Sequence, residues 1–109
     1  MRTLKFIVDG QSIVADPNCD FSGLVPGTQG YIRLEFAFSP EWNGCVKAAT
    51  FWSPMGKEYP GEILKDGCSC LAPTEALAKK RFLVQVVGKR DDYKILTHKV
   101  TICQNGGTT

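Results

Sequence analysis

The chain has 109 residues, of which 43% are hydrophobic and 22% charged, a balance typical of one globular domain and unlike that of a disordered or fibrous chain. A formal net charge of +2 is too small to indicate a nucleic-acid or anionic-membrane partner. The sequence shows neither the apolar length of a membrane span nor the hydrophobic core of a signal peptide. We therefore expect one soluble domain at residues 1–105, made in a cytoplasm, and a flexible tail at residues 106–109.

Five cysteines are spread along the chain: Cys19, Cys45, Cys68, Cys70 and Cys103. In a secreted module such a number would suggest disulfide bonds, but here the number is odd and no export signal precedes them. Reduced, mostly buried thiols are the favoured interpretation.

The first third of the chain predicts a hairpin and a long loop. Apolar residues alternate over residues 3–8, and Asp9-Gly10 is a typical hairpin turn before a second strand at residues 12–15. Turn-forming residues then fill most of residues 16–30. This composition predicts an irregular loop.

The strongest strand signal lies at residues 31–39, where apolar and polar side chains alternate with period two. Such a strand has one face in the core and one in water. Pro40 ends it because proline cannot donate a ladder hydrogen bond. Asn43-Gly44 then reads as a hairpin signal that leads into a strand at residues 46–52.

The second half of the chain predicts more short strands. A hairpin is expected at residues 62–71 around Asp66-Gly67. Residues 74–80 carry an N-cap candidate in Thr74, an acid in the first turn and cations in the last, which predicts one or two helical turns.

The last third reads as two strands, at residues 82–87 and 94–104, joined by a polar turn at residues 88–93. Together these elements give seven or eight short strands and one brief helix near residues 74–80. The sequence therefore predicts an all-β fold, an antiparallel, immunoglobulin-like β-sandwich.

His98 is the only histidine, so any acid–base or nucleophilic mechanism would depend on it. On the predicted last strand it shares a face with Leu96, Val100 and Ile102, so we expect it to point inward as a packed or edge-of-core residue. No nucleophile elbow or catalytic signature surrounds the serines, aspartates or cysteines. The sequence therefore predicts no enzymatic activity and no catalytic residue.

Cys68 and Cys70 are two residues apart on a predicted strand, whereas a zinc knuckle uses Cys-x-x-Cys around a turn. Combination with the other cysteines or His98 leaves a metal site open as a less favoured alternative. Small buried thiols are favoured, since free cysteine packs as a hydrophobe. We expect no metal and no cofactor.

Charged and aromatic residues supply the remaining candidate sites. The run Lys79-Lys80-Arg81 is read as solvated turn charge in preference to a phosphate-binding patch. Four amphipathic aromatics are candidate interface residues for a protein or a sugar: Trp42, Trp52, Tyr59 and Tyr93. Trp52 and Tyr59 are the preferred surface pair.

Two blocks of the sequence carry a resemblance. Residues 34–51 combine an aromatic alternation, an acid-Trp-x-Gly turn and then Lys, Ala and Phe. The second block holds Asp66, Cys70, Pro73, Glu75 and Leu77, then Phe82-x-Val84-x-Val86-x-Gly88, Thr97 and Gln104-x-Gly106-Gly107. Over roughly residues 31–107 the chain resembles small structural modules of phages and prophages of Firmicutes and gut bacteria.

The resemblance implies a non-enzymatic virion protein, either on the capsid surface as a decoration or head-fibre-like subunit, or in the tail or baseplate. Its partners would be other virion proteins, with several copies in the particle and contacts through an added edge strand or exposed aromatics. Such modules often continue into a linker and a fibrous segment, and this chain departs from that pattern by ending at the glycines. The alternative is a carbohydrate- or receptor-binding module with Trp52, Tyr59 and Trp42 as its stacking surface.

Overall fold

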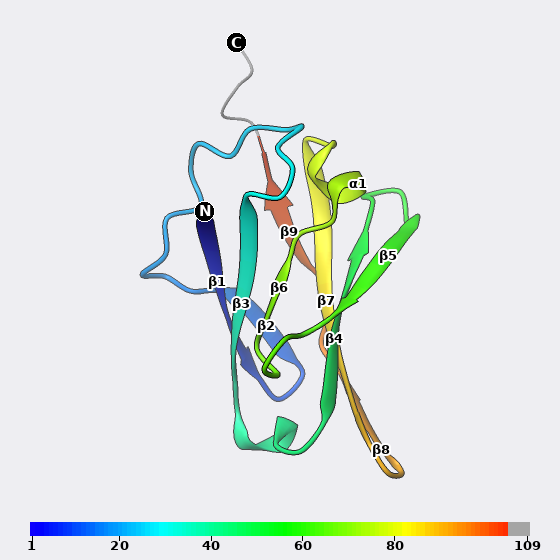
Figure 1. Ribbon diagram of the computed structural model, residues 1–109. Helices are drawn as coiled ribbons and strands as arrows, with labels where there is room; N and C mark the ends of the chain where they lie inside the picture. The colour runs from blue at the N-terminus through cyan, green and yellow to red at the C-terminus, as the bar shows by residue number, and fades with distance from the viewer. Residues whose placement is uncertain (105–109) are drawn as a thin grey trace.

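The computed structural model describes residues 1–104 and consists of two β-sheets packed face to face (Figure 1). The first sheet contains β1 (Arg2–Asp9), β2 (Ser12–Ala15), β3 (Ile32–Phe38) and β6 (Ser69–Leu71), in the order β2-β1-β3-β6. The second contains β4 (Val46–Trp52), β5 (Glu58–Ile63), β7 (Arg81–Arg90), β8 (Tyr93–Leu96) and β9 (Val100–Cys103), in the order β5-β4-β7-β8, with β9 also on β7. The predicted all-β sandwich is confirmed.

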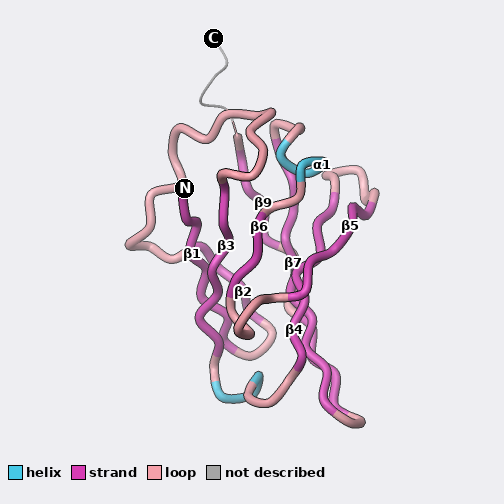
Figure 2. Tube along the Cα trace, viewed as in Figure 1, coloured by secondary structure: helices cyan, strands magenta, loops and turns pink. Residues whose placement is uncertain are grey.

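Helix is confined to two short segments, η1 (Pro40–Trp42) and α1 (Thr74–Leu77), as Figure 2 shows. None of the helical segments within residues 1–104 could span a lipid bilayer. The helix α1 is shorter than predicted, and its N-cap is Pro73, not Thr74. It ends early because the side-chain amide of Gln104 donates to the carbonyl oxygens of Leu77 and Lys79, at 2.9 Å each.

One strand pair departs from the predicted antiparallel arrangement, because β1 and β3 are parallel. The predicted loop at residues 16–30 explains this pairing. It carries the chain back to the end of the sheet where β1 starts, and there the Arg2 amide donates to the Tyr31 carbonyl at 2.9 Å. The next strand therefore runs in the same direction as β1.

The hairpin predicted at Asn43-Gly44 is wrong, because β3 and β4 lie in different sheets. Between them, η1 places Trp42 in the space between the sheets, where the side chain is 0% exposed. Its indole nitrogen donates to the Gly10 carbonyl at 2.8 Å, and its ring lies 5.1 Å from that of Phe38. Burial of this large side chain requires the chain to cross from one sheet to the other.

The turns at the ends of the sheets follow the sequence more closely. Asp66 and Gly67 both have positive φ, at 51° and 72°, as the predicted Asp-Gly turn requires. However, this turn joins β5 to β6, which belong to different sheets. The predicted polar turn at residues 88–93 is shorter than expected, since β7 continues to Arg90 and the hairpin extends beyond the body of the sandwich (Figure 1). The tail predicted at residues 106–109 lies outside the described residues.

The predicted last strand is interrupted at residues 97–99, which separate β8 from β9. Ile95 is buried in β8 and Thr97 at the start of the interruption, whereas Ile102 is buried in β9, so the buried positions change from odd-numbered to even-numbered residues. His98 is consequently exposed, and the prediction that it points inward is wrong. The Thr97 hydroxyl fixes this irregularity by accepting the Val86 amide at 3.1 Å.

Candidate functional site

The aromatic residues predicted as an interface do not form one exposed surface. Trp42 is 0% and Tyr59 7% exposed, so the prediction of Tyr59 as a surface residue is wrong, and Trp42 is not available as an interface residue. Tyr59 points into the core because it pairs across the strands with buried Phe51. With two of its three members in the core, the stacking surface predicted for a sugar is not formed.

The other two candidates, Trp52 and Tyr93, reach solvent but are engaged by neighbouring side chains. The Lys99 ammonium lies 3.7 Å from the centroid of the half-buried Trp52 ring and covers one face of it. The Tyr93 hydroxyl donates to the Glu41 carbonyl at 3.0 Å, and the Arg90 guanidinium lies 4.9 Å from the ring centroid. Both aromatic side chains are therefore already in contact with neighbouring residues of the same chain.

His98 joins the two sheets. Its Nε2 accepts the Ile13 amide of β2 at 3.3 Å, and its own amide donates to the Gln11 carbonyl at 3.1 Å. Because Nε2 accepts, the proton of the neutral ring is on Nδ1, which lies 3.1 Å from the Lys99 carbonyl. The imidazole thus has a structural bonding partner at each nitrogen.

The five cysteines are free thiols, two of them buried, two half-buried and one exposed. Burial, with the Glu62 carboxylate nearby, raises the pKa of the Cys70 thiol to about 12. A thiol that stays protonated at neutral pH is neither a nucleophile nor a ready metal ligand. Within residues 1–104, His, Cys, Asp and Glu side chains form no group of three or more that could hold a metal ion.

The outer face of the second sheet carries an apolar row that crosses four of its five strands, β5, β4, β7 and β8. Ile63 of β5 pairs with Ala48 of β4, Ala48 with Val87 of β7, and Val87 with Leu96 of β8. Residues directly opposite on neighbouring strands share a face of the sheet. Val46, two residues before Ala48, joins this row, which we call the apolar face: Val46, Ala48, Ile63, Val87 and Leu96.

The apolar face is open to solvent. Val46 and Ile63 are each 66% exposed, and the face is hollowed by a shallow groove of about 570 Å³ that Gly44 and Lys89 also line. An antiparallel sheet with one face in water normally alternates polar residues outward. The apolar face departs from that pattern at Val46, Ala48 and Val87, while Thr50, Gln85 and Lys89 on the same side of the sheet are polar.

The first sheet has a different outer face. Lys5, Glu35 and Ser69 stand side by side across β1, β3 and β6, and Arg33 forms an ion pair with Glu35 at 3.7 Å. Val14 is exposed there at 46% and pairs with Ile7, which is 37% exposed and pairs in turn with Ala37. This face therefore mixes charged side chains with a shorter apolar row.

The sheet edges offer little room for an added strand. β6 has 3 residues and β2 has 4, and β2 is also bonded to His98. β5 carries Pro60, which has no amide hydrogen, and its pairing with β4 shifts register between Ala49 and Phe51. Addition of a strand at β6, β2 or β5 is therefore less well supported than contact through a sheet face.

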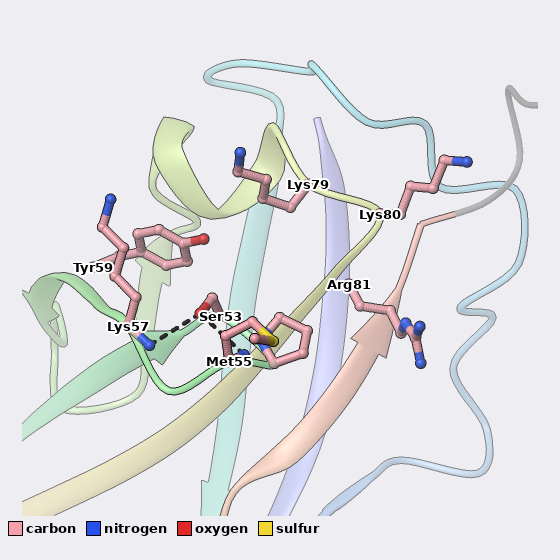
Figure 3. A pocket seen from close by; sticks show the side chains of 8 residues that line it. Ser53, Met55, Lys57, Tyr59, Lys79, Lys80 and Arg81 are labelled. Carbon is pink, nitrogen blue, oxygen red and sulfur yellow. Dashed lines mark hydrogen bonds between the residues drawn. The ribbon is translucent and has the colours of Figure 1, made fainter.

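A second surface feature gathers positive charge. Lys79, Lys80 and Arg81 are exposed, as predicted, but the fold brings Lys57 to the same open hollow of about 500 Å³ (Figure 3). Lys57 and Lys79 lie on either side of Tyr59, while the side chains of Lys80 and Arg81, which follow Lys79 in the same segment, point away from Tyr59. We call this surface the basic hollow.

The sequence contained a signal for the apolar face. Residues 82–87 are apolar at every position except Gln85, and the strand at residues 46–52 alternates imperfectly. Near-continuous apolar strands are typical of sheets covered on both faces. Which residues would align across the face depended on strand pairing, which periodicity does not specify.

Fold and surface together define an all-β sandwich whose second sheet has an apolar row on its outer face. No family model, curated protein or solved structure matches the chain. Since one fold serves many functions, the function has to follow from the surface residues themselves.

Proposed function

We propose that this protein is a non-enzymatic structural subunit that acts through protein–protein contacts made by its apolar face. The main supporting observation is the row Ile63–Ala48–Val87–Leu96, which crosses β5, β4, β7 and β8, with Ile63 and Leu96 exposed and Ala48 and Val87 half-buried. Contiguous exposed apolar patches on soluble proteins are typical of interaction sites. A partner that covers this face would complete the layered packing of the second sheet.

The setting we propose is a phage virion, on the capsid surface or in the tail or baseplate. The support for this setting is the sequence resemblance of residues 34–51 and of the second block to phage structural modules. A non-enzymatic role fits the side chains with catalytic potential, since both nitrogens of His98 are engaged by backbone groups and Cys70 holds its proton.

A charge placed in the apolar face should remove the chain from the particle. We expect Val46→Lys to lower the amount that co-sediments with purified particles at least about tenfold, because a buried unpaired charge opposes a desolvated contact. Stability should change by less than about 0.5 kcal/mol, since Val46 is exposed in the free protein. Quantitative immunoblotting of gradient-purified particles measures the effect.

Val14→Lys is the matched control, because it makes the same change at an exposed valine on the other sheet. It should co-sediment like the unmodified chain. Equal retention of both variants would rule out the apolar face as the contact, and purified particles without the unmodified chain would rule out the virion setting.

A further inference from the structure

The basic hollow lies at one end of the second sheet, between two chain segments that flank β4 and β7. One wall is the turn at residues 53–57 and the other is the segment at residues 79–81. Its lining includes 4 cationic side chains, those of Lys57, Lys79, Lys80 and Arg81, and no carboxylate (Figure 3). Such a concentration of one sign of charge produces a positive local potential.

No carboxylate of the described chain neutralises these cations. Within residues 1–104 the ion pair that forms is between Arg33 and Glu35, on the other sheet. The cationic side chains that line the hollow give it an excess of positive charge, which a bound anion would offset. The charge pattern of the basic hollow therefore matches an anionic ligand.

Both walls are held in place by hydrogen bonds. The Ser53 hydroxyl accepts the amides of Met55 and Lys57, at 3.2 and 3.0 Å, and the Ser53 amide donates to the Lys57 carbonyl at 2.7 Å. On the opposite wall, buried Gln104 binds the Lys79 carbonyl through its side chain and the Lys80 carbonyl through its amide. Fixed walls reduce the conformational entropy lost on binding.

The chemistry of the hollow favours an acidic protein segment over nucleic acid. Single-stranded nucleic acid is usually held by aromatic rings that stack on bases. Here Tyr59 is buried, and Lys99 covers the ring of nearby Trp52. Pro54 and almost fully exposed Met55 give the hollow an apolar wall beside its cations, which suits a peptide with both carboxylate and apolar side chains.

We infer that the basic hollow binds carboxylates of an acidic segment on a protein partner. This inference rests on the proposed function, that the chain acts through protein–protein contacts, and names the chemistry of the partner: a segment rich in acidic residues. The cations would increase the rate of encounter and fix the orientation of the partner.

The test uses a fluorescein-labelled hexaglutamate peptide, with hexaglutamine and oligothymidylate as comparison probes. Anisotropy at low salt gives the affinities, and amide chemical shifts of the 15N-labelled chain locate the contact. We expect hexaglutamate to shift the amides of residues 53–57 and 79–81, with binding weakened as salt rises. The double variant Lys57→Glu/Lys79→Glu should weaken it at least about tenfold.

The matched control is Lys5→Glu/Lys65→Glu, which reverses two exposed lysines outside the hollow. It should change hexaglutamate affinity less than about twofold. Equal weakening by both double variants, no saturable binding of hexaglutamate, or tighter binding of oligothymidylate at the same amides would each overturn the inference. Particle association distinguishes a failure of this inference from a failure of the proposed function. The Val46→Lys variant should no longer co-sediment with the particle, but it should still bind hexaglutamate.

Discussion

Replacing Trp42 with alanine should destabilise the domain by about 3–5 kcal/mol, a large share of the ~5–15 kcal/mol that stabilises a typical domain. The indole fills the space between the sheets, where η1 crosses from β3 to β4, and its nitrogen donates to the Gly10 carbonyl at 2.8 Å. Gly88 of β7 lies against the ring so closely that a Cβ there would be 2.7 Å from a ring carbon. Removal of the indole therefore leaves both a cavity and an unpaired carbonyl.

Urea unfolding followed by far-ultraviolet circular dichroism measures this loss. Trp52→Ala is the matched control, because Trp52 is half-buried on the outer side of the sheet and its removal should cost only about 1 kcal/mol. If the two variants lost equal stability, Trp42 would not have the central packing role that its position indicates.

The second large effect is expected at Gln104. Its side-chain nitrogen donates to the carbonyls of Leu77 and Lys79 while the residue is buried, at 1% exposure. Gln104→Glu replaces that donor with an oxygen that can only accept when ionised, so three acceptors would face one another without water. We expect a loss of at least about 3 kcal/mol at neutral pH.

The loss should become smaller at acidic pH, where the protonated carboxyl regains one donor. Gln85→Glu is the control, since the Gln85 side chain also donates to a carbonyl, that of Thr97, but is half-buried. The same unfolding experiment at two pH values compares them. Equal and pH-independent losses would mean that Gln104 does not hold the segment that carries Lys79 and Lys80.

Local sequence patterns predicted the elements of this fold well. The alternation at residues 31–39 appears as β3, with Leu34 and Phe36 in the core, and Asp66-Gly67 forms the expected turn. These features depend on neighbouring residues along the chain. Period-two alternation decides which side of a strand is buried, and positive φ favours glycine and aspartate at turns.

Features that depend on long-range packing were predicted less well. Trp42 follows Pro40 in a polar turn, and the turn does not reveal that the chain crosses between sheets there. His98 was assigned to the wrong face because the interruption at residues 97–99 changes the parity of the strand. A one-residue shift of this kind moves every subsequent side chain to the opposite face of the sheet.

The candidate site also combines features that local sequence predicts with features that depend on long-range packing. The exposure of Lys79, Lys80 and Arg81 could be predicted from their charge, but not the approach of Lys57 from another turn. Likewise, the apolar residues of β4 and β7 were evident in the sequence, whereas their alignment with Ile63 and Leu96 required the strand register.

Hydroxyl-radical footprinting of the chain, free and bound in the particle, tests the central proposal most directly, because side chains are oxidised according to their exposure. Binding through the apolar face predicts that oxidation of Val46, Ile63 and Leu96 falls in the particle, while Val14 and Val25, exposed elsewhere on the molecule, react as before. Protection of Val14 with Val46 and Ile63 still reactive would contradict the proposal.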